Sequence, residues 1–125
     1  MSYILPFRTA KFNPSVPCPG EDVAEWLRGK LAEAGFTSDE QTREEWGWVF
    51  GLPHHGKFYF IGIVGQPDEQ AEERNQGDWE ILIEKHRTAA EKLFGTNKLS
   101  EQEPIVLLIE RLLVSEGGIR MLVRD

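Results

Sequence analysis

Apolar residues follow two different spacings along this chain, and the two spacings predict different secondary structures. Alternating apolar and polar positions, typical of a half-buried strand, occur at 46–52, 59–63 and 79–86. Apolar residues three and four positions apart, typical of an amphipathic helix, occur over 21–36 and after Pro104. We therefore expect three strands in the middle of the chain and a long helix on either side of them.

The first two of these strands flank the sequence Pro-His-His-Gly and predict a hairpin. A four-residue connection is commonly built around a type I turn. That turn would place the following residues opposite each other: Leu52 and Lys57, Phe50 and Tyr59, Trp48 and Ile61, Trp46 and Ile63. One face of the hairpin is then an aromatic and aliphatic wall, which the third strand extends with Trp79, Ile81 and Ile83.

Shorter patterns predict the remaining elements. Residues 3–12 are typical of a first strand, which Pro6 confines to an edge or to the start of the strand. Thr88 stands three positions before Glu91, which is capping-box spacing, and a short helix would follow and end at Gly95. The chain closes with an alternating segment typical of one more strand.

The predicted order of elements is β-α-β-β-β-α-α-β. Long amphipathic helices combined with a mostly antiparallel sheet are typical of the α+β class and of a two-layer sandwich. We expect a sheet of four to five strands with two long helices and one short helix on one face. A chain of 125 residues has a common domain size, so we expect a single domain over residues 1–125.

Charge and composition indicate which classes of partner and which compartment to expect. The formal net charge is −7, and an acidic surface repels phosphate backbones, so we expect no nucleic-acid partner. The chain lacks an apolar run long enough to span a bilayer and a recognisable signal peptide, so we expect no membrane partner. The single cysteine, Cys18, cannot form an internal disulfide, which favours a reducing compartment. We expect a small cytoplasmic protein of bacterial type with no cofactor.

Histidine and cysteine provide only weak candidates for chemistry. A zinc site usually gathers three or four spaced ligands, whereas His54 and His55 are adjacent in a turn and His86 stands alone. These three histidines are weak metal candidates, and ordinary solvated turn residues are the simpler interpretation. Cys18 lies between two prolines rather than at a helix N-terminus that would lower its pKa, so catalysis by Cys18 is a weak hypothesis.

The face of the sheet opposite the wall is the most interesting surface. Alternation places apolar and charged side chains together on this face, and we select as candidate ligand-binding or interface residues Phe58, Phe60, Glu80, Leu82, Glu84 and His86. Glycines on the same face often mark a close approach by another group. The apolar members need cover, either from a terminus of the chain or from a second molecule.

Three hypotheses for function follow. The leading one is a protein-interaction module without catalytic activity, which associates with itself or with a protein partner through this face or through an edge strand. The first alternative is an enzyme or small-ligand-binding protein with a pocket near Trp46, Trp48, Glu80, Glu84 and His86, provided that a bulge at Gly47 redirects the two tryptophans. The second alternative is an acidic inhibitor of immunity type that covers a basic partner, with the acidic stretch 68–73 as its lure.

Overall fold

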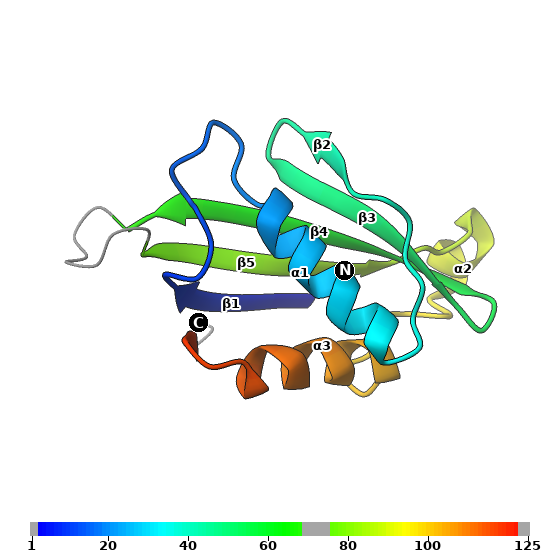
Figure 1. The fold of residues 1–125 in the computed structure, drawn as a ribbon. Helices are drawn as coiled ribbons and strands as arrows, with labels where there is room; N and C mark the ends of the chain where they lie inside the picture. The colour runs from blue at the N-terminus through cyan, green and yellow to red at the C-terminus, as the bar shows by residue number, and fades with distance from the viewer. Residues whose placement is uncertain (1–2, 69–75, 123–125) are drawn as a thin grey trace.

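Over the residues that the structure describes, the protein forms one antiparallel sheet of six strands with three helices, an α+β fold (Figure 1). The structure is a computed structural model, and it describes residues 3–68 and 76–122. In spatial order the strands are β2 (Thr42–Glu44), β3 (Gly47–His54), β4 (Lys57–Pro67), β5 (Gly77–Lys85), β1 (Tyr3–Thr9) and β6 (Ile119–Met121). The two edge strands, β2 and β6, have three residues each.

Two of the helices lie on one face of this sheet, which we call the inner face. These are α1 (Glu21–Glu33), which crosses the sheet in front of β3 to β5 in Figure 1, and α3 (Pro104–Ser115), which lies along the β1 side. The short helix α2 (Ala89–Phe94) lies beyond the end of the strands and buries none of its residues. The prediction that all three helices cover one face is therefore wrong for α2. The opposite face, which we call the outer face, has no described helix packed on it.

The core lies between the inner face and the helices α1 and α3. Every second residue of the four central strands points into the core. Each of the two helices adds the apolar residues of one face, which recur about every 3.6 positions. Buried side chains from the strands include Phe7, Phe50, Ile61, Ile63, Trp79, Ile81 and Ile83, and those from the helices include Leu27, Leu31, Ile105, Ile109 and Leu113. Each such side chain contributes roughly 1.5 to 3 kcal/mol by leaving water.

The β3–β4 hairpin has a tighter turn than the sequence predicts. His54 pairs with Lys57, so only His55 and Gly56 connect the strands. Both have positive φ, 49° and 77°, which is the conformation of a two-residue type I′ turn and matches the twist of a hairpin. The predicted register is therefore wrong by two residues: Phe50 pairs with Ile61 rather than with Tyr59. A shift of two residues keeps the paired side chains of β3 and β4 on their predicted faces, so this part of the wall survives the error.

The sheet also has one strand more than the upper predicted number. Strand β2 lies in a polar segment in which all three residues are exposed, so no alternation marks it. β2 pairs with the start of β3, from Thr42 opposite Val49 to Glu44 opposite Gly47. The first strand is shorter than predicted and ends at Thr9 rather than near residue 12. The remaining order of elements is as predicted.

Local signals at the helix ends are confirmed. Helix α1 ends just before Gly35, and the amide of Phe36 donates to the carbonyl of Leu31 at 2.8 Å. The capping box of α2 is present, with Gly95 in the left-handed conformation after it. Pro104 occupies the first turn of α3. None of the helices within residues 3–68 and 76–122 has the length and apolar character needed to cross a membrane.

The acidic stretch 68–73 stands between two strands, since β4 continues to Pro67 and β5 begins at Gly77. Most of the acidic stretch 68–73 lies outside the described residues. A carboxylate oxygen of Asp68, the first residue of this stretch, lies 3.8 Å from the guanidinium of Arg8.

Candidate functional site

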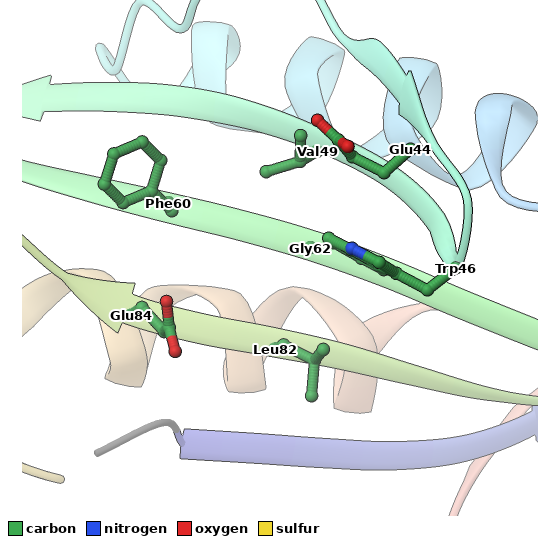
Figure 2. A pocket seen from close by; sticks show the side chains of 7 residues that line it. All are labelled: Glu44, Trp46, Val49, Phe60, Gly62, Leu82 and Glu84. Atoms are coloured by element: carbon green, nitrogen blue, oxygen red, sulfur yellow. The ribbon is translucent and has the colours of Figure 1, made fainter.

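The outer face carries a hollow of about 490 Å³, which we call the outer groove (Figure 2). The seven residues that line it come from four neighbouring strands and the β2–β3 turn, and they are Glu44, Trp46, Val49, Phe60, Gly62, Leu82 and Glu84. Apolar side chains form most of the lining, and one carboxylate lies on either side of Gly62 in the figure. A volume of several hundred Å³ with a few polar groups is typical of binding sites.

Cross-strand pairing explains why these residues meet. On the outer face Gly62 lies between Val49 of β3 and Leu82 of β5. Two residues away along β4, Phe60 lies opposite Glu84. Side chains directly opposite each other in an antiparallel pair have Cβ atoms about 5 Å apart, so the floor of the groove is fixed by the register of the sheet. A glycine in the centre of this floor leaves the space that the neighbouring side chains surround.

Trp46 forms one wall of the groove because its indole lies over Gly62. A Cβ on Gly62 would lie 2.9 Å from the ring atom Cη2 of Trp46. The chain reaches this position through Gly47, where a Cβ would collide with the carbonyl oxygen of Ile63. The prediction that Trp46 belongs to the inner wall is therefore wrong: Gly47 redirects it to the outer face, where 48% of its surface is exposed.

Phenylalanines continue the aromatic surface beyond the groove. Phe60 is 40% exposed and lies edge-on to Phe58, with ring centroids 5.1 Å apart. The Phe58 ring covers Gly51 as Trp46 covers Gly62. His86 follows at 6.4 Å from the Phe60 ring. The outer-face glycines thus receive the close approach that the sequence predicts, and the approaching groups are rings of the same chain.

The structure brings together part of the predicted candidate set. Phe60, Leu82 and Glu84 line the outer groove itself. Phe58 and His86 extend the same face toward the β3–β4 turn. Glu80 does not line the groove: it borders a second, smaller hollow of about 250 Å³.

That second hollow shows what the C-terminal segment covers. It lies among Val64, Glu80 and Leu122, at the opposite end of the outer face from Phe58. The amide of Leu122 donates to the carbonyl of Pro6 at 3.0 Å, which continues the β6 pairing. Leu122 therefore reaches the face near Val64, whereas Phe60 and Trp46 keep large exposed fractions.

The alternative pocket with two tryptophans does not form, because Trp48 lies on the other side of the sheet. Trp48 pairs with Ile63 on the inner face, and its indole N–H donates to the carbonyl oxygen of Cys18 at 2.9 Å. Of the two tryptophans, Trp46 thus lies on the outer face as that alternative requires, and Trp48 does not.

Cys18 helps to hold the turn that carries Trp46. Its thiol lies 3.6 Å from the carbonyl oxygen of Glu44 and 3.7 Å from that of Gly47, distances suited to weak S–H hydrogen bonds. Together with the Trp48 indole, these contacts join the loop before α1 to the β2–β3 turn. The structure therefore gives Cys18 a supporting position behind the groove.

Two of the three histidines, His54 and His55, are in contact with each other at the β3–β4 turn. His54 packs on the ring of Phe36 at 4.6 Å and on that of His55 at 4.1 Å. Burial, followed by electrostatic repulsion from His55 and Lys57, lowers the pKa of His54 below its ordinary value. His86 lies on the outer face. Across residues 3–68 and 76–122, no three histidine, cysteine or carboxylate side chains converge in a way that would hold a metal ion.

A buried polar cluster on the inner face has no counterpart among the sequence predictions. Glu103, just before α3, accepts a hydrogen bond from the Tyr59 hydroxyl at 3.0 Å and pairs with the Lys85 ammonium at 2.7 Å. The amide of Ser100 donates to the second carboxylate oxygen of Glu103 at 2.8 Å. Lys85 continues the inward positions of β5 after Ile83, and a lysine at such a position is the one signal in the sequence for this cluster.

The cluster perturbs the acidities of its own members. Burial alone would raise the pKa of Glu103, but hydrogen bonds from Lys85, Ser100 and Tyr59 outweigh burial and hold that pKa below its ordinary value. Burial, with the neighbouring Glu103 carboxylate, raises the pKa of the Tyr59 hydroxyl. Every polar group here has a partner, so the cluster fixes the 100–103 segment and the start of α3 against the sheet.

Comparisons with known proteins identify no relative: no protein-family model, no curated protein and no solved structure matches the chain. The geometry of the outer face therefore has to support any functional conclusion by itself.

Proposed function

We propose that this protein is an interaction module that associates with a second copy of itself through the outer face of its sheet, with the outer groove at the centre of the contact. The observation that carries the proposal is the exposure of two large aromatic side chains, Trp46 and Phe60, on either side of an apolar hollow. Aromatic residues of this kind are the commonest anchors at protein interfaces.

Contacts between the rings and the sheet reduce the freedom of the aromatic side chains on the outer face, which favours association. The Trp46 ring rests on Gly62, and the Phe58 ring rests on Gly51 and on the edge of Phe60. Aromatic side chains held in one position lose little conformational entropy when they bind. Among residues 3–68 and 76–122, cover of this face by the C-terminal segment is limited to the neighbourhood of Leu122.

The face is a better contact surface than the edges of the sheet. The edge strands β2 and β6 offer three residues each. β2 pairs only with residues 47–49 of β3, and in the unpaired remainder of β3 Pro53 has no amide hydrogen to donate. Short edges and proline are devices that discourage pairing with another strand.

A dilution series followed by ¹⁵N–¹H NMR tests the proposal residue by residue. We expect concentration-dependent shifts at the amides of Val49, Gly62 and Leu82 and at the Trp46 indole N–H. Amides in α1, which cover the inner face, provide the internal control and should stay constant. Spectra independent of concentration, or changes centred on α1 or α3, would refute association through the outer face.

Small-molecule binding is a second candidate, which the lining of the groove favours. An aromatic wall at Trp46 with carboxylates at Glu44 and Glu84 suits an apolar ligand that carries a positive charge. Titration with benzyltrimethylammonium should then shift the Trp46 indole N–H resonance, and the matched neutral ligand neopentylbenzene should shift it less. An unchanged resonance would reject this candidate. No observation in the described residues favours the inhibitor hypothesis beyond the net charge.

A further inference from the structure

Helix α2 is stabilised by hydrogen bonds at its ends. The Thr88 hydroxyl accepts from the amide of Glu91 at 3.1 Å, and the Glu91 carboxylate accepts from the amide of Thr88 at 2.9 Å. The Arg87 guanidinium donates to the carbonyls of Glu91 and Thr96 at 2.9 and 3.1 Å. No residue of α2 is buried, so these local bonds maintain a helix that contributes nothing to the core.

What α2 presents to solvent is a pair of adjacent apolar side chains. Leu93 is 79% exposed and Phe94 is 75% exposed, the two largest exposed fractions among the large apolar side chains that the structure describes. Single exposed apolar residues are normal on protein surfaces. Two neighbours on a helix that is capped at both ends form a small apolar projection, which we call the α2 tip.

The surroundings of the α2 tip and of the outer groove have opposite charge. Residues 86–98, which follow the buried Lys85, carry three basic side chains and one acidic side chain in a protein of net charge −7. The groove is flanked by the carboxylates of Glu44 and Glu84. Two copies of an acidic protein repel each other overall, so a basic projection and an acidic groove give association a preferred orientation.

The positions of the two surfaces within one molecule allow a reciprocal contact. His86 ends the outer-face row that contains Phe60, and α2 begins three residues later, beyond the end of the strands (Figure 1). The groove and the tip are therefore neighbours, yet Leu93 and Phe94 remain exposed and do not fill the groove of their own chain. A two-fold axis between two copies uses the same two surfaces on each partner.

We propose that the outer groove is occupied by the α2 tip of a second copy, with Leu93 and Phe94 packed between Trp46 and Phe60 and with both partners exchanging this contact. This inference rests on the proposed function, because it names the occupant of the same outer-face site.

Two complementary variants test the occupant. Phe60→Lys places a positive charge in the groove and leaves the α2 tip intact, whereas the double substitution Leu93→Ser with Phe94→Ser removes the tip and leaves the groove intact. Val114→Ser is the matched control, since Val114 is 64% exposed on α3, away from both surfaces. Light scattering over a concentration series gives the dimer dissociation constant for each protein.

We expect the wild-type chain and Val114→Ser to dimerise alike, and each test variant to dimerise at least about 30-fold more weakly. An equimolar mixture of the two test variants restores one intact groove facing one intact tip. The mixture should therefore form a heterodimer, detected as a rise in anisotropy when one variant, labelled at its N-terminus, is titrated with the other. Nonspecific damage to folding would not produce this rescue.

Other outcomes separate the two proposals. If Phe60→Lys abolishes dimerisation and the tip variant dimerises normally, the proposed occupant is wrong and association through the outer face stands. If the tip variant is monomeric and Phe60→Lys dimerises normally, both the groove and its occupant are wrong. A wild-type chain that remains monomeric at millimolar concentration overturns both proposals. A mixture that fails to form a heterodimer rejects the reciprocal contact.

Discussion

The two faces of the sheet are built from the same strands, but only one of them is a core. Ile61 and Phe60 are neighbours in β4: Ile61 is fully buried beneath the helices, whereas Phe60 remains partly exposed on the outer face. On the inner face helices supply the cover, and on the outer face aromatic rings lie over glycines of adjacent strands. The difference shows that alternation assigns side chains to faces, and that the packing of other elements decides which face stabilises the fold.

The sharpest test of this comparison uses those two neighbours. Ile61→Ala should lower the free energy of unfolding by about 4 kcal/mol, because it leaves a cavity in a packed interior. Phe60→Ala removes a larger side chain but should cost about 1 kcal/mol or less, since water already reaches the ring. Urea denaturation at low protein concentration measures both values for the monomer. Equal losses would mean that the outer face is covered in solution.

A second test compares a carboxylate on each face. Glu103→Gln should destabilise the fold by about 3 kcal/mol near pH 7, because it leaves the buried Lys85 ammonium without its counter-charge. Glu80→Gln, at an exposed position of the outer face, is the control and should change stability by less than about 0.5 kcal/mol.

The pH dependence of this second test has a definite sign. The native pKa of Glu103 lies below the ordinary value of 4.5, so the ionised carboxylate stabilises the native state above that value. The contribution disappears as the pH falls through the lowered native pKa. Denaturation curves recorded at a series of pH values should therefore show the wild-type and Glu103→Gln proteins converging in acid. A constant difference down to the lowest pH would contradict the role of ionised Glu103.

The smallest expected effects come from the glycines around the groove. A Cβ on Gly47 would meet the backbone carbonyl of Ile63, which cannot move without disturbing the sheet. We expect Gly47→Ala to cost about 2 kcal/mol. Gly62→Ala would meet only the far edge of the Trp46 ring, which can rotate away, so it should cost well under about 1 kcal/mol while increasing the quenching of Trp46 by acrylamide. A larger loss for Gly62→Ala than for Gly47→Ala would contradict this picture.

Much of the fold could be predicted because its signals are local. Period two in β3, β4 and β5 assigns inner and outer residues, and the spacing of Thr88 and Glu91 identifies the start of α2. The turn was harder, since a histidine with positive φ is uncommon and Pro-His-His-Gly also suits a four-residue connection. His55 adopts that conformation here because the twist of the hairpin favours it.

Only those residues of the candidate site could be predicted whose face follows from alternation within their own strand. Phe60, Leu82 and Glu84 follow from alternation. Glu44 belongs to an edge strand with no apolar pattern. The position of the Trp46 side chain depends on the close approach of the Gly47 backbone to Ile63, a contact between segments that are distant in sequence. The partners of Glu103 lie 18 and 44 positions away, and no spacing rule connects such residues.

Because α2 is isolated from the core, it is the segment of the described chain at which we expect proteolysis of the native protein to begin. A segment that buries nothing can open by breaking its end caps alone, at a cost far below that of unfolding the sheet. A protease that cleaves after large apolar residues would therefore meet Leu93 and Phe94 in the native state long before it reached the strands. The first cut in the chain would fall in α2, and the two fragments would remain joined by α3 and β6, which hold the C-terminal part to β1.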